Sequence, residues 1–445
     1  MGTWPLPTEL TALITGLATP LHGRLAWRLL PLMAGALFAH GRRTVASWLR
    51  GASLGHDYKA YYYFLGALGR KCELLAALLL RRAVALLAPR GRLLFALDDT
   101  PTKRYGKQVE GAGVHHNPTP GPADHKFVYG HVWVTLAWVV RHPLWGTLAL
   151  PLRALLYVRR QGIGLLEQGY GVRFETKLQM AARLIDWLAD WLKFLGQPLW
   201  LVADGAYAKR PVLKQARARG VVVVSRLRKD AALWSVPTPP RPGQPRKRGP
   251  KPTYGKQAIS LAKRAGHRGG WRSEPFVLYG EEVIKTYKTF LATYRPAYGL
   301  IRVVLVKERG GWEAFFCTDP QASVAQVLEA YADRAAVEQG FKDLKEVHGV
   351  GQQQVRNYWA NVAAYHLGLW WHTLIELWAW ARPQGRLCDR SASPWDDPER
   401  RPSHADKRKA LRQECLRAGI RRAQGRRPPR RGFRAVLRRL LALVG

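Results

Sequence analysis

Four polar side chains of different chemistry recur at short intervals in the stretch YADRAAVEQGFKDLK. Tyr331, Arg334, Glu338 and Lys345 are separated by three, four and seven residues. On one α-helix these positions fall within an arc of about 60°, because each residue advances by about 100°. The apolar residues of the same stretch cluster on the neighbouring arc. The spacing therefore predicts a polar row that borders the core, with Glu338 half-buried. The alternative is a solvated helix edge with one Glu-to-Lys pair.

Carboxylates also follow two predicted strands. RLLFALDDT (92–100) is an apolar strand that we expect to end on Asp98 and Asp99, and PLWLVADGAY (198–207) is a buried strand that ends at Asp204. In open α/β sheets, sites form at the carboxyl ends of the strands. Neighbouring carboxylates repel each other and stay ionised readily only around a cation, and oxygen ligands suit Mg²⁺. The pattern predicts a Mg²⁺ site at this edge.

Together the two patterns predict phosphodiester chemistry. Two Mg²⁺ ions held by Asp98 or Asp99, by Asp204 and by Glu338 would activate a water or a 3′-hydroxyl and stabilise the leaving oxygen. Mn²⁺ is the expected substitute. Arg334 would bind a phosphate through two parallel hydrogen bonds from its guanidinium, and Tyr331 and Lys345 would bind neighbouring phosphates.

The charge of the chain agrees with a polyanionic partner. The 445 residues carry 71 Lys+Arg against 31 Asp+Glu, a net charge of +40, and 47% of them are hydrophobic. Residues 226–272 and 399–445 together supply 25 of these net charges. Such blocks are typical of phosphate-contacting surfaces or tails, and double-stranded DNA is the expected partner.

Other sequence classes are disfavoured. The four cysteines form no CxxC pair, and none lies near a His at zinc-ligand spacing. This pattern disfavours a zinc site and a disulfide framework and fits a reducing cytoplasm. The start MGTWPLPTEL lacks a secretory pattern, and the apolar runs are too short or too interrupted for a membrane span. We therefore expect a cytoplasmic, nucleoid-associated protein with no membrane contact.

The order of predicted elements indicates a mixed α/β fold. Residues 1–90 are expected to be helical, either as a helix-turn-helix-like DNA reader or as an ordinary helical bundle. Residues 91–227 begin with three strands in a meander, followed by helix, strand, helix and strand. That order predicts a ribonuclease H-like mixed sheet with helices on its faces, forming the first part of a catalytic core.

The second half interrupts and then completes that core. Residues 228–319 are expected to form a basic, β-rich insertion domain, including a hairpin that turns at Arg309. Residues 320–382 would return to the core with the Glu338 helix and a long aromatic helix, whose Trp residues we interpret as core packing. Residues 383–445 are expected to form a helical, basic C-terminal region for DNA contact or dimerisation. We expect much of this tail to become ordered only on DNA.

These motifs resemble those of bacterial insertion-sequence transposases of the DDE type. Tyr331, Arg334, Glu338 and Lys345 match without a gap the Tyr-x2-Arg-x3-Glu-x6-Lys signature of one branch. DDT (98–100) is similar to the first Asp motif of the family, and VADGAY (202–207) to the second. The resemblance implies the catalytic acids Asp98, Asp204 and Glu338. Asp98 is preferred to Asp99 because it takes the first place of Asp-x-Thr, with Asp99 as a turn cap.

The resemblance also implies a function. A homodimer assembled on DNA would bind terminal inverted repeats. It would then catalyse metal-dependent DNA strand cleavage and strand transfer in cut-and-paste transposition. Trp312 is the candidate for stacking an extruded base, with core packing as the alternative, and Lys342 is expected to contact DNA. The alternative function is a catalytically inactive or domesticated sequence-specific DNA-binding descendant.

Overall fold

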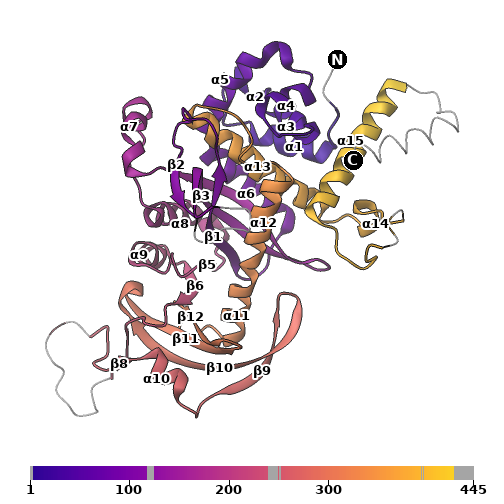
Figure 1. Cartoon of the computed structure of the whole chain (residues 1–445). Coiled ribbons are helices and arrows are strands. Elements are labelled where there is room, and N and C mark those ends of the chain that lie inside the picture. The colour runs from indigo at the N-terminus through magenta and orange to yellow at the C-terminus, as the bar shows by residue number, and fades with distance from the viewer. Residues whose placement is uncertain are drawn as a thin grey trace.

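One large mixed sheet organises the chain, and helices cover its faces (Figure 1). The computed structural model describes residues 4–117, 125–238, 249, 252–391, 393 and 395–424. The strand order along the sheet is β2-β3-β1-β5-β6-β12-β11-β10-β7-β8, with β4 paired to β3 and β9 paired to β10.

The central part of the sheet combines an antiparallel meander with two parallel strands. Its strands are β1 (Leu93–Lys103), β2 (Gly113–His116), β3 (Phe127–His142), β4 (Gly146–Tyr157), β5 (Leu199–Ala203) and β6 (Val222–Leu227). β3 is antiparallel to both β1 and β4, whereas β5 is parallel to β1 and to β6. All five residues of β5, LWLVA, are buried, as expected for a central parallel strand. This mixed α/β arrangement is consistent with the predicted ribonuclease H-like fold.

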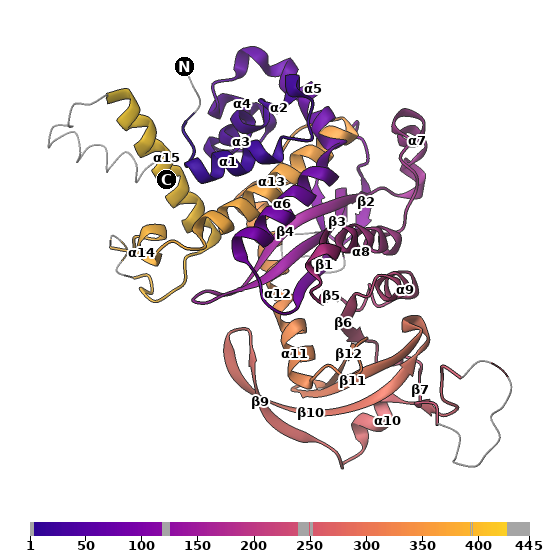
Figure 2. The same cartoon turned by 180° about the vertical axis from the view of Figure 1, so that it is seen from behind.

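The helices that follow the meander pack on both sides of this sheet (Figures 1 and 2). They are α7 (Gly164–Tyr170), α8 (Lys177–Leu192), α9 (Arg210–Ala218), α11 (Val324–Asp333), α12 (Ala335–Glu346) and α13 (Tyr358–Ala379). α8 begins with a capping box between Thr176 and Gln179, which satisfies backbone donors at the helix start. α13 is buried over nearly its whole length, and the Trp370 and Trp371 indoles donate to backbone carbonyls. Trp370 and Trp371 are therefore packing residues, as predicted.

The first ninety residues are helical, as predicted, and pack against α13. The helices are α1 (Thr8–Leu17), α2 (Gly23–Ala26), α3 (Leu29–Phe38), α4 (Val45–Gly51), α5 (Tyr58–Gly69) and α6 (Cys72–Leu87). α3 and α4 cross closely at Gly35, where a Cβ atom would lie 2.1 Å from the Trp48 carbonyl oxygen. A Cβ atom at Gly69 would lie 2.0 Å from the Trp359 carbonyl oxygen, so α5 approaches the start of α13 equally closely.

The strands between residues 228 and 319 extend the same sheet. They are β7 (Leu233–Trp234), β8 (Ala258–Ile259), β9 (Arg272–Leu278), β10 (Glu281–Tyr294), β11 (Gly299–Glu308) and β12 (Gly311–Cys317), with α10 (Leu261–Gly266) before β9. β12 pairs with β6, so these strands continue the central sheet. The β11–β12 hairpin turns at Arg309 and Gly310, as predicted. Most of the basic run at 238–257 lies outside the described residues.

The C-terminal region is more ordered than the sequence predicts. α14 (Gln384–Leu387) precedes α15 (His404–Gln424), and His404, Lys407, Arg408 and Arg412 of α15 are buried. The Arg408 guanidinium donates to the Leu37 carbonyl oxygen of α3 at 2.8 Å. The expectation of a tail ordered only on DNA is therefore wrong for α15, because its basic residues pack into the protein. Residues 425–445 lie outside the described residues.

Within the described chain, no helix has the length and apolarity to cross a membrane.

Candidate active site

The parallel pairing of β1 with β5 brings the two predicted aspartates to one edge of the sheet. The pairing ends at Leu97 opposite Ala203, so Asp98 and Asp204 each follow at the same step. β1 does not end on the aspartates, as the sequence predicted, but continues to Lys103 alongside β3, with Asp98 opposite Thr135. The acids therefore lie just beyond the last paired residues of β1 and β5.

Asp98 and Asp99 have different partners. Asp98 Oδ2 accepts a hydrogen bond from Arg334 Nη1 at 2.8 Å. Asp99 accepts from Lys177 Nζ at 2.6 Å and from the Tyr207 hydroxyl at 2.7 Å. Because successive side chains of a strand point to opposite faces, Asp98 faces the α11–α12 junction and Asp99 faces the start of α8.

The stretch that carries the polar row forms two helices instead of one. α11 ends at Asp333 and α12 begins at Ala335, with Arg334 at the junction. The Arg334 guanidinium donates to Asp98 through Nη1 and to Glu338 Oε1 through Nη2 at 2.6 Å. The Glu338 side chain is 59% exposed, so the expectation that it is half-buried is wrong. Arg334 links two of the three predicted acids.

Burial dominates the electrostatics of this edge. Desolvation raises the pKa of Asp98 to about 6; the Arg334 charge lowers it, while the Asp99 and Asp204 charges raise it. Burial by itself lowers the pKa of Arg334, but the carboxylates around it, Asp98 foremost, raise it above its ordinary value. Asp98 is thus a desolvated acid whose ionised form requires a cation beside it.

Tyr331 lies against the sheet beside this group. Its ring centroid is 4.7 Å from that of Phe315 on β12, and the Arg334 guanidinium carbon lies 5.6 Å from the Tyr331 ring. Arg226 on β6 is ion-paired with Glu313 on β12 and lowers the pKa of Tyr331, although burial raises that pKa more. Sequence reasoning missed Arg226, because its position depends on the pairing of two strands far apart in the chain.

Lys342, Lys345 and Trp312 are the other residues predicted to contact DNA. Lys342 and Lys345 are exposed on α12, beyond Glu338. Trp312 is on β12 three residues before Phe315, so strand alternation directs it to the other face of the sheet. Lys229 Nζ lies 5.2 Å from the Trp312 ring centroid. The structure therefore does not bring Trp312 to Tyr331 or Glu338.

The residues of this edge fit a hard divalent cation. The predicted ligands are three carboxylates, one of them desolvated, and a cationic guanidinium already bridges two of them. Their oxygens are not gathered within 4.8 Å of one another. In the described part of the chain, the group that is gathered so closely is His372, Glu376 and His404. The Arg334 guanidinium donates to both the Asp98 and the Glu338 carboxylates.

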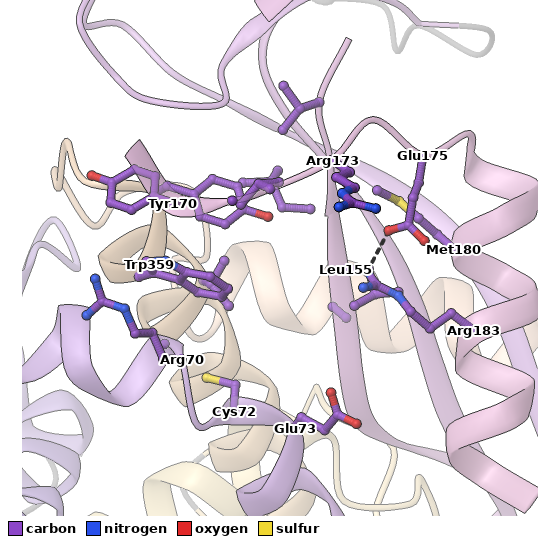
Figure 3. Close-up of a pocket in the computed structure, with 18 of the residues that line it drawn as sticks. Arg70, Cys72, Glu73, Leu155, Tyr170, Arg173, Glu175, Met180, Arg183 and Trp359 are labelled. Atoms are coloured by element: carbon purple, nitrogen blue, oxygen red, sulfur yellow. Dashed lines mark ion pairs between the residues drawn. The ribbon is translucent and has the colours of Figure 1, made fainter. Parts of the chain in front are cut away.

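A cavity of about 560 Å³ lies between the α5–α6 turn, β4, the α7–α8 segment and α13 (Figure 3). Its lining includes Arg70, Arg173, Tyr170 and Trp359, all missed by sequence reasoning because they come from separate elements. The buried Nη1 of Arg153, another lining residue, has no hydrogen-bond partner among the described residues. Arginine and aromatic side chains together are typical of surfaces that bind nucleic acid.

Asp98 and Asp204 follow two strands that pair in parallel, and Arg334 ties Glu338 to Asp98. Comparison with family models identifies the class of protein. The family described as DDE superfamily endonuclease matches residues 18–273, and the transposase DDE domain matches residues 175–374. The first match covers more than half of the chain, so the chain belongs to the DDE superfamily of endonucleases and transposases. A search of curated proteins finds no match.

Membership has direct consequences for the chemistry. The DDE superfamily is a family of nucleotidyl-transfer enzymes, and its members are typically dependent on a divalent metal. The transposase domain match indicates a transposase, and a transposase binds DNA.

Proposed function

We propose that this protein is the transposase of a bacterial insertion sequence, from the branch with the Tyr-x2-Arg-x3-Glu-x6-Lys signature. It binds terminal inverted repeats and catalyses metal-dependent DNA strand cleavage and strand transfer in cut-and-paste transposition. The observation that carries the proposal is the Arg334 bridge, which ties the signature segment to Asp98 on β1. A signature that served only as a solvated helix edge would have no reason to contact the acid at the sheet edge.

The proposed roles follow from the contacts. Asp98, Asp204 and Glu338 would hold two Mg²⁺ ions, with Mn²⁺ as a substitute. When bound, the ions lower the pKa of an attacking water or hydroxyl and neutralise charge at the phosphodiester. Arg334 exchanges its carboxylate partners for a DNA phosphate, which its planar fork binds in a bidentate manner.

The remaining residues of the site have supporting roles. Tyr331 and Lys345 bind phosphates beside the scissile bond, and Lys342 binds DNA further along α12. Lys177 and Tyr207 hold Asp99 on the other face of β1 and thereby fix the direction of Asp98.

The rest of the chain is assigned to DNA handling. Residues 1–90 bind the transposon end, residues 91–227 and 320–382 form the catalytic core, and residues 228–319 form an insertion domain. Trp312 in that insertion would stack an extruded base. The basic region 383–445 contacts DNA or the partner subunit of a DNA-assembled homodimer in the nucleoid. The Arg70–Tyr170–Trp359 cavity supplies a further surface of the right chemistry for a DNA strand.

The Arg334 bridge also favours a second candidate, a catalytically inactive DNA-binding descendant of a transposase. In such a protein, Arg334 would satisfy Asp98 and Glu338 permanently and no metal would be required. The two candidates differ in whether the carboxylates exchange the guanidinium for a metal ion.

The test uses the full-length protein and labelled duplexes carrying the DNA that flanks its coding region. Cleavage and binding are compared in Mg²⁺, in Ca²⁺ and in EDTA. Cleavage at a discrete end in Mg²⁺ alone supports the transposase. Discrete binding without cleavage in any metal, Mn²⁺ included, supports the inactive descendant.

The same assay with Glu338→Gln tests the third acid. Loss of a metal-ligand charge is expected to reduce cleavage by roughly 10²–10³-fold while end binding is retained. Glu346→Gln, an exposed position on the same helix, is the matched control and should cleave normally. Full cleavage by Glu338→Gln would remove this residue from the site.

A further inference from the structure

A second cluster of metal-binding side chains lies away from the acid edge, where α13, α15 and the end of α12 meet. The ligand atoms of His372, Glu376 and His404 lie within 4.8 Å of one another, and all three residues are buried. His348, just after α12, adds a third imidazole, with its Nε2 only 2.8 Å from His404 Nε2. The His372 and His404 rings are stacked, with centroids 4.0 Å apart.

Hydrogen bonds determine which nitrogen of His404 is free to bind a cation. His404 Nδ1 lies 2.7 Å from Glu376 Oε1, and Glu376 Oε2 accepts from Lys407 Nζ at 2.5 Å. Glu376 is ion-paired with the Lys407 ammonium, so its carboxylate acts as an acceptor. Because a carboxylate only accepts, the proton in the contact with Glu376 is on His404 Nδ1. Its Nε2 therefore presents a lone pair toward His348.

The two Nε2 atoms of His348 and His404 face each other at hydrogen-bonding distance. Two neutral imidazoles share one hydrogen bond at most, whereas a cation is a partner for both lone pairs. His372 Nδ1 is buried and has no hydrogen-bond partner among the described residues. Asp343 Oδ2, 3.7 Å from His372 Nε2, places a negative charge beside the group.

We propose that His348, His372 and His404 form a structural binding site for one transition-metal ion, with Zn²⁺ as the best match. Neutral imidazole nitrogens are ligands that Zn²⁺ prefers and Mg²⁺ does not. Glu376 then has the role of the carboxylate that accepts the second ring proton of a metal-bound histidine and fixes its orientation. Zinc–nitrogen bonds of about 2.0–2.1 Å need the two Nε2 atoms to separate by roughly half an ångström.

The site adjoins a cavity of about 230 Å³ that is lined by Asp343, His372, Glu376, His404 and Lys407. It joins three parts of the chain: α12, which carries Glu338; the core helix α13; and the C-terminal helix α15. A bound ion would therefore fasten α15 to the helix that carries the third acid. The ion stabilises the fold and has no part in cleavage.

The experiment measures metal content and stability of the full-length protein purified without a histidine tag. After dialysis against chelator, Zn²⁺ or Co²⁺ is added, and bound metal is measured by elemental analysis and by the visible spectrum of Co²⁺. We expect one bound equivalent, and a higher melting temperature with Zn²⁺ than with chelator. Absence of a bound equivalent, or an unchanged melting temperature, overturns the proposal without any substitution.

Variants locate the ion. His348→Ala and His404→Ala should each lose the equivalent and the Zn²⁺-dependent rise in melting temperature. His56→Ala, an exposed histidine, should keep both. An Asp98→Asn/Glu338→Gln double variant should also keep the equivalent, which separates this site from the acid edge. Retention of zinc by both cluster variants, or its loss from the double variant, refutes the assignment. The test is independent of whether the protein cleaves DNA.

Discussion

Arg334 Nη1 lies 2.8 Å from Asp98 Oδ2, although the two residues are 236 positions apart in the chain. The same guanidinium donates to Glu338, one helical turn further along. Arg334 therefore lies between the acid of the sheet and the acid of the helix. In the absence of metal it supplies the positive charge that the desolvated Asp98 carboxylate requires.

Substitution of Arg334 tests this relationship. Without the guanidinium, the pKa of Asp98 should rise above its present value, and the metal-free protein should lose about 1–3 kcal/mol of unfolding free energy. Mg²⁺ should bind the DNA-free Arg334→Ala variant more tightly, because no guanidinium competes for the carboxylates. Urea unfolding and calorimetric Mg²⁺ titration measure the two effects.

The control for this prediction is Arg141→Ala. The Arg141 guanidinium pairs with Glu329 and Asp333 of α11. These two partners lie close to Arg334 in the sequence but are not predicted metal ligands. Its loss should leave Mg²⁺ affinity unchanged. Weaker Mg²⁺ binding by Arg334→Ala would show that the guanidinium supports the ion instead of competing with it.

Asp98 and Asp99 should behave differently when neutralised. Asp98→Asn should abolish cleavage, because it removes a predicted metal ligand. Asp99→Asn should retain cleavage but lose about 1–2 kcal/mol of unfolding free energy, because Lys177 and Tyr207 lose a charged acceptor. Duplex cleavage and urea unfolding of both variants show which aspartate is the first acid. If Asp99→Asn is the inactive one, the first acid has been assigned to the wrong residue.

Lys345 should contribute to the salt dependence of DNA binding. A lysine that neutralises one phosphate releases counterions, so Lys345→Ala should reduce the slope of log K against log salt by about 0.9. Fluorescence anisotropy between low and moderate salt measures this slope. Lys214→Ala on α9 is the control, since Lys214 is equally exposed but lies on another helix. Equal slopes for the two variants would argue against a phosphate contact at Lys345.

Stability should fall in mild acid because α13 buries a neutral histidine. Burial lowers the pKa of His366 to about 4, and its ring bonds the Ala154 N–H and the Val362 carbonyl. Since the unfolded chain binds this proton at its ordinary pKa, the contribution of His366 is complete above about pH 6.5 and is lost as the pH falls toward 4. The slope in that window is at most about 1.4 kcal/mol per pH unit.

The measurement is the free energy of urea unfolding at neutral pH and at several values down to pH 4.5. His366→Gln should flatten the acid side of the profile relative to the unsubstituted protein. His56→Gln, at an exposed histidine, should leave the slope unchanged. An unaltered acid slope in His366→Gln would assign the acid sensitivity to other groups.

Much of the central fold follows from local patterns. The apolar strands around 92–100, 198–207 and 220–227, and the helical patterns near 173–195 and 354–381, are long or strongly patterned, and the structure has an element at each. The β11–β12 hairpin also follows from its Arg-Gly-Gly turn. The break at Arg334 has no such signal, because neither Gly nor Pro marks it. The order of α15 depends on buried contacts of basic residues, which composition reports only as charge.

The sequence by itself determined the class of the protein, because residue types and their spacing are local properties. The aspartates after two apolar strands and the Tyr-Arg-Glu-Lys spacing are visible without a fold. Only the tertiary structure decided which carboxylate Arg334 contacts, and that Lys177 and Tyr207 donate to Asp99. It also decided that His348, His372 and His404 lie together. Those outcomes depend on strand register and helix packing, where a shift of one residue turns a side chain to the opposite face.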